Sequence, residues 1–266
     1  MAEDADTARA DLLVRDDDRI RILTLNRPER RNALSTAVTS RLVEEVASAA
    51  SDHDVWVVVI TATGTEAFCA GADLEEMAGA DAARRPPRGP MGGAARNVHE
   101  AVAELPKPTI AGINGAAVGG GFELALACDL RVASRQARLG LPEAKRGMGA
   151  NFASVVLPRL APPAVALELL YLGEYISAED AARWGIVNRV VEPEAVEEET
   201  LQLARAVAAN APVSLRRMKE MYVKGASLPL AAALRLGAGP DPYTSEDRAE
   251  GVAAFVEKRT PRWRNR

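Results

Sequence analysis

The stretch GAAVGGGFELALACD, Gly115 to Asp129, sets three consecutive glycines before a glutamate and an apolar run. Glycine is a poor helix former, and a charge within a hydrophobic face is costly. A strand ending at Asn114-Gly115, then the glycines, then an apolar helix aims unpaired backbone N–H groups at whatever lies at the helix start. Glycine also lets a ligand approach the backbone closely. The segment could hold a phosphate or a developing oxyanion, or its glycines could serve only close packing of helix on strand.

Two further segments favour the oxyanion. The stretch contains neither G-x-x-x-x-G-K-[ST] nor G-x-G-x-x-G, the usual phosphate-binding signatures. AFCAGADL, Ala67 to Leu74, places small residues at a second strand-to-helix turn, and two such turns can aim two N–H groups at one carbonyl oxygen. LGLPEAKRG adds Glu143, twenty positions after Glu123 (143 minus 123). Two carboxylates beside an oxyanion hole form a general acid/base pair, although a lone glutamate is more often a solvated charge.

Periodicity around these motifs predicts an α/β fold. DRIRILTLN alternates and indicates a strand, with LLVR as its hairpin partner and the turn at Asp16-Asp17-Asp18. Ser35 can cap a helix whose apolar positions are Val38, Leu42, Val46 and Ala49. Buried strands are indicated in VWVVVITA, PKPTIAGING and LRVAS. Strands alternating with helices predict right-handed crossovers.

The later part of the chain reads differently. From about Phe152 the pattern is almost wholly helical, and from Ala195 there is too little strand for a sheet. We therefore expect a core over 1–194 and a helical region over 195–266, docked on the core or on a neighbouring subunit. The Gly-, Pro- and Arg-rich residues 79–96 predict an exposed loop. The helical region carries more apolar residues than a solvent-facing appendage should: Val207, Leu215, Met218, Met221, Leu230 and Leu234.

Composition excludes several classes. The chain has 266 residues, 48% hydrophobic, and a net charge of -4, so electrostatics give no case for nucleic-acid binding. Two cysteines argue against a disulfide framework, and the acidic N-terminus resembles neither a signal nor a transit peptide. The apolar runs are too short to cross a membrane. We expect a soluble, cytoplasmic protein without a metal site, in which His53 and His99 are surface residues.

Four motifs in order, NRPERRNAL, AFCAGADL, PKPTIAGINGAAVGGGFELALACD and LGLPEAKRG, resemble the crotonase or enoyl-CoA hydratase/isomerase superfamily. The similarity continues to SEDRAEGVAAFVEKR and so covers nearly the whole chain. It implies a spiral of ββα units, a C-terminal helical region for trimerisation, often as a dimer of trimers, and an acyl-CoA thioester substrate that itself carries the coenzyme A. The positions that match the family's oxyanion hole are Ala72 and Gly120, with Glu123 pointed into the site.

The resemblance also bears on the reaction. Hydratases of the family have both glutamates and its isomerases often keep one, so Glu123 and Glu143 favour reversible hydration of a 2-enoyl-CoA. The alternatives are a Δ3,Δ2-enoyl-CoA isomerase, a carnitinyl-CoA-type dehydratase, another crotonase-fold hydrolase or lyase, and a non-catalytic CoA- or RNA-binding relative. The segment LAPPAVALELLYLGEYISAEDAARWGIVNRVV and the end FVEKRTPRW are similar to the carnitinyl-CoA dehydratase branch.

The family's substrate contacts fall on identifiable positions. The resemblance implies Arg30 and Arg31 near the nucleotide phosphates, although Glu29 stands where a lysine is usual. It further implies substrate or CoA contacts at Ala70, Asp73, Leu74, Gly119 and Pro142, and at Phe255 and Lys258 toward a neighbour's site. Asp73 could equally be only a helix-start residue.

One loop departs from the family pattern. After Glu143 the sequence reads GMGANFASVV, with Ala150 where proline is usual and Asn151 where a glycine helps to seat water. The Asn151 side chain could bond a polar acyl group, obstruct the usual water position, or simply cap the following helix.

Overall fold

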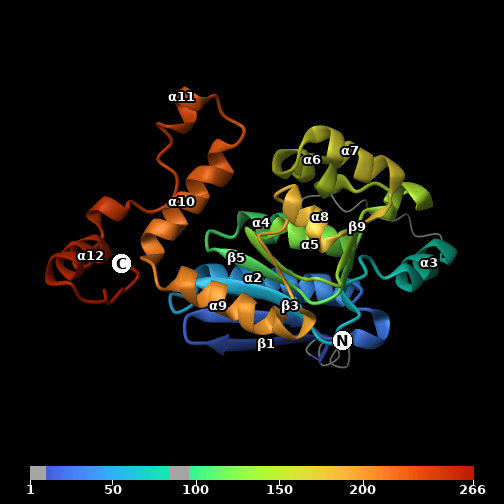
Figure 1. Ribbon diagram of the computed structural model, residues 1–266, viewed down its shortest axis with the longest axis horizontal. Helices are drawn as coiled ribbons and strands as arrows, with labels where there is room; N and C mark the ends of the chain where they lie inside the picture. Colours follow the sequence, from blue (N-terminus) through green and yellow to red (C-terminus); the bar gives the residue numbers. More distant parts are fainter. Residues whose placement is uncertain (1–9, 84–95) are drawn as a thin grey trace.

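The computed structural model describes residues 10–83 and 96–266 (Figure 1). Most of the loop predicted over 79–96 therefore lies outside the described residues, but its first four residues are helical and end α3 (Leu74–Ala82), so the loop starts later than predicted. In the described part of the chain, no helix is both long and apolar enough to span a membrane.

The chain opens with the predicted hairpin. β1 (Leu12–Asp17) pairs antiparallel with β2 (Ile20–Leu25). The turn, however, is Asp18-Arg19 and not the three aspartates, because Asp16 and Asp17 pair with Arg21 and Ile20 in the ladder. Of the three aspartates, only Asp18 adopts the left-handed conformation, at φ 52°.

The first long helix follows the sequence pattern. α2 (Thr36–Ser51) begins after Ser35, whose side chain accepts a hydrogen bond from the backbone N–H of Val38. Its predicted apolar positions are all buried: Val38, Leu42, Val46 and Ala49. A 3-10 turn, η1 (Pro28–Arg30), precedes it.

The larger of the two sheets has six strands in the order β1-β2-β3-β5-β7-β10. β3 (Val57–Ala62), β5 (Thr109–Ile113) and β7 (Leu130–Ser134) are the three predicted buried strands, and they run parallel to one another. β10 (Arg189–Val191) lies in the region that was expected to be almost wholly helical, so that expectation is wrong there. Its three residues become a strand by pairing with β7, a long-range contact that local periodicity does not report.

A smaller sheet carries the site. Its order is β4-β6-β8-β9, formed by β4 (Ala67–Cys69), β6 (Ala116–Val118), β8 (Arg138–Gly140) and β9 (Tyr175–Ser177). β9, like β10, lies in the region expected to be helical and is a strand because it pairs with a distant strand, β8. β4, β6 and β8 each follow a strand of the larger sheet and precede a helical turn, which gives repeated strand–strand–helix units. The turns are α3, α5 (Gly120–Ala127) and η2 (Pro142–Arg146), so they all start at one edge of the small sheet.

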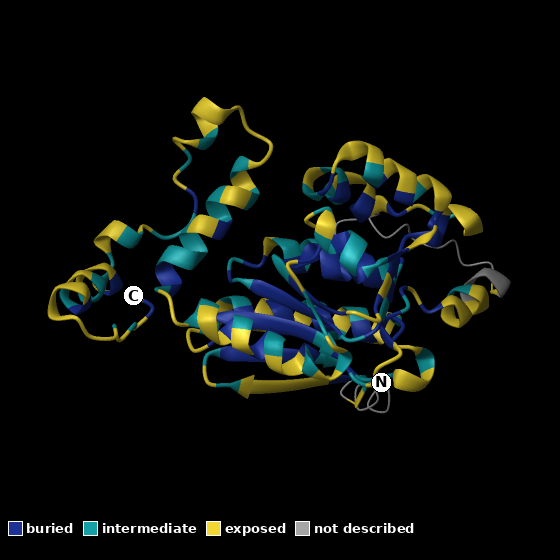
Figure 2. Cartoon of the chain, viewed as in Figure 1, coloured by how far each residue is buried: buried dark blue, intermediate teal, exposed yellow. Residues whose placement is uncertain are grey.

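The remaining helices divide into two groups. α4 (Val98–Glu104), α6 (Asn151–Leu160), α7 (Pro163–Leu172) and α8 (Ala178–Arg183) pack around α5 and the small sheet. α9 (Val196–Ala208), reached through η3 (Pro193–Ala195), packs Leu201 and Ala204 on the larger sheet. Beyond it, α10 (Pro212–Gly225), α11 (Leu230–Ala233), η4 (Pro242–Thr244) and α12 (Glu246–Glu257) extend away from the core (Figure 1). Figure 2 shows how much of these last elements is exposed.

Candidate active site

Glu123 lies in the first turn of α5, a helix buried along almost its whole length. Its side chain is only 5% exposed, and its Oε1 accepts a hydrogen bond of 2.9 Å from the backbone N–H of Ala153. Ala153 is in the first turn of α6, where N–H groups have no partner within the helix. Burial raises the pKa of Glu123, and hydrogen bonds from Ala153 and Phe152 partly offset that rise.

Glu143 stands in η2, directly after the buried Pro142. Within the described residues its Oε2 is buried without a hydrogen-bond partner. The carboxylate lies directly against Gly119, because a Cβ added to that glycine would be 2.8 Å from Oε1 of Glu143. Burial raises the pKa of Glu143, and the negative charge of Glu123 raises it further. The structure therefore brings both glutamates to the glycine turn at the start of α5.

The two glycine-containing turns meet beside these carboxylates. A Cβ on Gly71 would lie 3.1 Å from the backbone nitrogen of Gly120, and a Cβ on Gly120 would lie 3.8 Å from that of Ala72. The bridge between Leu34 and Ala72 uses the carbonyl of Gly71 and the N–H of Asp73, which leaves the Ala72 N–H unused. Among the described residues, neither the Ala72 nor the Gly120 N–H has a backbone acceptor. Two free donors side by side can hold one anionic oxygen.

The conformation of this turn explains its glycines. Gly119 is the N-cap of α5 at φ 55°, a left-handed value that favours glycine, and its N–H donates to the carbonyl of Gly140 at 2.9 Å. At Gly121 a Cβ would lie 2.2 Å from the carbonyl oxygen of Cys69, so only glycine lets α5 pack on β4. Close packing and an N–H without a backbone acceptor in the described part of the chain therefore come from neighbouring glycines of one turn.

The family model described as enoyl-CoA hydratase/isomerase matches residues 15–266 of this chain. The chain belongs to the enoyl-CoA hydratase/isomerase family. The prediction of an enzyme, of the hydro-lyase type acting on CoA thioesters, is thereby confirmed, as is the α/β crotonase fold with its C-terminal helices.

Individual relatives agree with the family assignment. The chain is 41% identical to an (E)-benzylidenesuccinyl-CoA hydratase of Thauera aromatica over 253 residues, which covers 91% of this chain and 94% of that protein. It is 39% identical to a carnitinyl-CoA dehydratase of Citrobacter koseri over 251 residues, 92% of this chain and 94% of the relative. The crystal structure of an enoyl-CoA hydratase from Bacillus anthracis superposes with a TM-score of 0.87 at 34% identity, covering 96% of this chain and 100% of that chain.

His99 is the residue that the sequence interpretation misplaced. It was expected at the surface but is 6% exposed, with its Nε2 3.0 Å from the carbonyl oxygen of Gly120 and its ring 5.5 Å from the ring of Phe152. Burial lowers the pKa of His99. The sequence held part of the signal: Asn97 and Glu100 form a capping box, which places His99 in the first turn of α4 but does not show which face of that helix is buried. His53, in contrast, is exposed as predicted.

The residues matched to CoA contacts lie next to Ala72. The Asp73 carboxylate accepts hydrogen bonds from the N–H groups of Glu75 and Glu76, at 3.2 and 3.4 Å, and so serves the helix-start role considered for it. It also pairs with Arg30 at 3.2 Å, while Glu75 pairs with the same guanidinium at 2.8 Å. Ala70 and Leu74 are partly or largely exposed beside it. Arg31 is exposed in the left-handed conformation at φ 50°.

The remaining matched residues differ in where they lie relative to the glutamates. Phe255, 86% exposed, and Lys258 lie at the end of α12, well away from α5 in the same chain (Figure 1). Asn151 is the first residue of α6, and the N-cap is Ala150 without a side-chain cap bond. The idea that Asn151 caps this helix is therefore wrong, because its side chain begins inside the helix and folds toward Gly149 instead.

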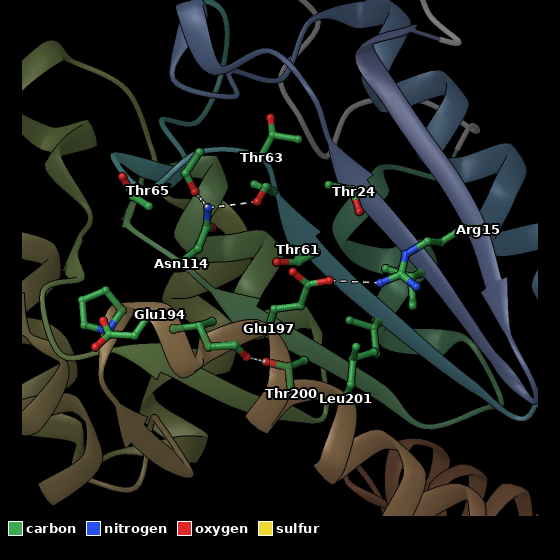
Figure 3. Close-up of a pocket in the computed structure, with 16 residues that line it drawn as sticks. Arg15, Thr24, Thr61, Thr63, Thr65, Asn114, Glu194, Glu197, Thr200 and Leu201 are labelled. Carbon is green, nitrogen blue, oxygen red and sulfur yellow. Dashed lines mark hydrogen bonds and ion pairs between the residues drawn. The ribbon is translucent and has the colours of Figure 1, made fainter.

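A separate cavity of about 360 Å³ lies between the larger sheet and α9 (Figure 3). Its polar lining is mostly hydroxyl and amide: Thr24, Thr61, Thr63, Thr65, Asn114 and Thr200. An ion pair of 3.1 Å between Arg15 and Glu197 crosses one side of it. Glu123, Glu143, Ala72 and Gly120 do not line this cavity, so it is distinct from the candidate active site.

Proposed function

We propose that the chain catalyses the reversible addition of water to a 2-enoyl-CoA thioester. Glu123 and Glu143 are the acid/base pair, and the N–H groups of Ala72 and Gly120 hold the thioester oxygen. The observation that carries this proposal is the convergence of two buried carboxyl groups with raised pKa values on two backbone donors that have no backbone acceptor. Membership of the family supports it independently.

The environments of the two carboxyl groups support different roles. The N–H groups of Ala153 and Phe152 stabilise the ionised form of Glu123, which suits a base that removes a proton from water. Among the described residues, Glu143 lacks a hydrogen bond on Oε2 and feels the charge of Glu123, an environment that suits the carboxyl group that carries the proton. In hydration, hydroxide adds at C3 as Glu123 takes the water proton, and Glu143 delivers its proton to C2. Dehydration is the same sequence reversed.

The oxyanion hole supplies the electrostatic part of the reaction. Attack at C3 moves an electron pair to the thioester oxygen, where the two N–H groups donate to the resulting enolate more strongly than to the ground-state carbonyl. Losing one such donor typically costs about 2.7–4 kcal/mol of transition-state stabilisation. Retention of two carboxyl groups favours hydration over a double-bond shift. A double-bond isomerase and a carnitinyl-CoA-type dehydratase remain the alternatives.

We further propose how the substrate is held. The nucleotide part lies along Arg30, Arg31, Ala70 and Leu74, next to Ala72. The acyl part passes Gly119 and Pro142, and the exposed Asn151 bonds a polar acyl group through its amide.

We also propose how the chain is organised. Residues 1–194 form the core, and residues 195–266 form the region through which subunits assemble. Phe255 and Lys258 of this second region contribute to a neighbouring subunit's site, and the protein works in the cytoplasm.

A substrate panel tests the reaction. The purified protein is incubated with carnitinyl-CoA and with 2-enoyl-CoA and 3-hydroxyacyl-CoA thioesters that differ in their acyl groups. The molecular mass of each product is measured by mass spectrometry. We expect a gain of one water on enoyl substrates and its loss on hydroxyacyl substrates. A double-bond shift without change of mass, detected by chromatography, would select the isomerase. No reaction with any thioester would reject the proposal.

A further inference from the structure

We infer that His99 is a positioning residue for the oxyanion hole, holding the Gly119–Gly120 turn through the carbonyl of Gly120. This inference rests on the proposed function, since it concerns the donor that the proposal assigns to Gly120. The contact is the 3.0 Å approach of the His99 Nε2 to that carbonyl oxygen. His99 belongs to α4, so the contact ties the start of α5 to a second helix.

The protonation state of the ring follows from its partners. A carbonyl oxygen only accepts, so the Nε2 of His99 carries the proton of this bond. In the described residues, Nδ1 is buried without a hydrogen-bond partner. A second proton at Nδ1 would have no acceptor, and the ring is therefore a neutral imidazole with its single N–H aimed at Gly120.

The carbonyl oxygen of Gly120 does not need the bond from His99 in order to have a hydrogen-bond donor. Gly120 is the first residue of α5, so helix geometry already directs the N–H of Leu124 at its carbonyl. The backbone needs a different kind of support here: three glycines in a row have no side chains to restrict their dihedral angles. The N–H and the carbonyl of Gly120 lie on the two peptide planes that meet at its Cα, so holding the carbonyl fixes one of these planes as the support from which the other is positioned.

His99 also touches the element that holds Glu123. Its ring lies 5.5 Å from that of Phe152, whose neighbour Ala153 donates to the Glu123 carboxylate. One buried ring thus contacts the turn that presents the oxyanion donor and the helix start that orients the base. Displacing it would misalign both, and a shift of about 1 Å in a catalytic group can cost on the order of 100-fold in rate.

Two variants separate the hydrogen bond from packing. His99→Phe keeps an aromatic ring against Phe152 but removes the donor, whereas His99→Gln loses the ring and keeps an amide N–H at the position of Nε2. We expect His99→Phe to lower kcat on the order of 10- to 100-fold with little change in KM. The carbonyl stretching frequency of a bound enoyl thioester should move back toward its value in free solution. His99→Gln should restore both quantities toward those of the wild type.

The opposite outcomes overturn the inference. If His99→Phe keeps the wild-type kcat and carbonyl frequency, or if His99→Phe is active and His99→Gln is not, then His99 is only a packing residue. If neither variant folds, ¹⁵N NMR of the wild-type protein decides which ring nitrogen of His99 carries the proton. The protein has two histidines, one exposed and one buried, so their signals can be distinguished. A neutral ring protonated at Nε2 supports the contact, and a ring protonated at Nδ1, or at both nitrogens, rejects it. A wild-type protein that converts no thioester would instead reject the proposed function, whereas the ¹⁵N NMR measurement would still test the His99 contact.

Discussion

The carboxylate of Glu123 accepts a 2.9 Å hydrogen bond from the backbone N–H of Ala153, a residue thirty positions later in the chain. The bond joins the first turn of α5 to the first turn of α6. It uses an N–H that has no partner inside its own helix, and it favours the ionised form of a carboxyl group that burial would otherwise keep protonated. A buried glutamate is thereby kept available as a base.

Replacing either glutamate by glutamine should stop most of the reaction without preventing binding. Glu123→Gln and Glu143→Gln are nearly isosteric and remove only proton transfer, which contributes roughly 10²–10⁴-fold. Steady-state hydration and the dissociation constant of a non-reactive acyl-CoA thioester are the two measurements. The exposed Glu66, changed to Gln, is the control. A variant that retains wild-type turnover shows that its glutamate has been assigned wrongly.

Gly120→Ala should abolish activity in a stable protein. The added Cβ meets only ordinary contacts, but it lies on the side of Gly120 that faces the Ala72 nitrogen, 3.8 Å away, where the proposed oxyanion would bind. We expect kcat to fall on the order of 10²–10³-fold while Tm stays at or above the wild-type value, since alanine is the better helix former. Gly237→Ala, where a Cβ meets nothing within 4 Å, is the matched control. Unchanged kcat in Gly120→Ala would exclude this N–H as an oxyanion donor.

The buried charge of Glu143 should make the protein less stable at high pH. Burial and the charge of Glu123 raise the pKa of Glu143 above its ordinary value of 4.5. A carboxyl with a raised folded-state pKa stabilises the fold below the unfolded value and loses that contribution as pH rises through the folded value. Glu143→Gln should therefore have a higher Tm than the wild type at pH 8, by a few degrees, because about 1 kcal/mol corresponds to ~2–4 °C in a chain of this size.

The advantage of Glu143→Gln should shrink as the pH falls below 4.5, where the wild-type carboxyl is protonated in both states. Thermal melts of the two proteins at a series of pH values measure this difference. A Tm difference that is independent of pH would mean that the charge of Glu143 has no part in it.

Asn151→Gly should change substrate preference. Since Ala150 is the N-cap of α6, loss of the Asn151 side chain removes no cap bond, and stability should fall only by the usual cost of glycine in a helix, up to about 1 kcal/mol. If the amide binds a polar acyl group, kcat/KM for polar substrates should fall relative to that for simple enoyl thioesters. Equal changes across the whole substrate panel would remove Asn151 from the specificity determinants.

The helical extension should assemble three or six copies of the chain. Of the apolar residues noted in the sequence, Val207 packs on the core, while others remain exposed: Met218, Leu230 and Leu234. Tyr222, Phe255 and Val256 in the same region are also exposed, and symmetric association would cover such apolar side chains. Light scattering of the full-length protein should give a trimer or hexamer. A stable, fully active monomer at micromolar concentration would reject this, together with the roles of Phe255 and Lys258.

Local signals were sufficient for much of this molecule. Side-chain periodicity, β-branched runs and the cap at Ser35 correctly predicted the hairpin, the buried strands of the larger sheet and α2. The two glycine turns were also evident, because the residue types that permit a positive φ and a close approach are few. Each of these features has a signal within a short stretch of sequence, either a cap, a run of β-branched residues or a glycine turn, and the sequence by itself determines them.

Tertiary packing decided the rest. β10 is a strand only because β7 pairs with it, and Asn151 begins a helix without capping it. His99 is buried because α4 packs against α5 and α6, a contact that an isolated histidine in the sequence does not reveal. The same long-range packing removes Glu123 and Glu143 from water and brings them to one turn, which raises both pKa values. Residue types fixed what chemistry was available, and burial between distant segments decided which of those groups meet and in what state of ionisation.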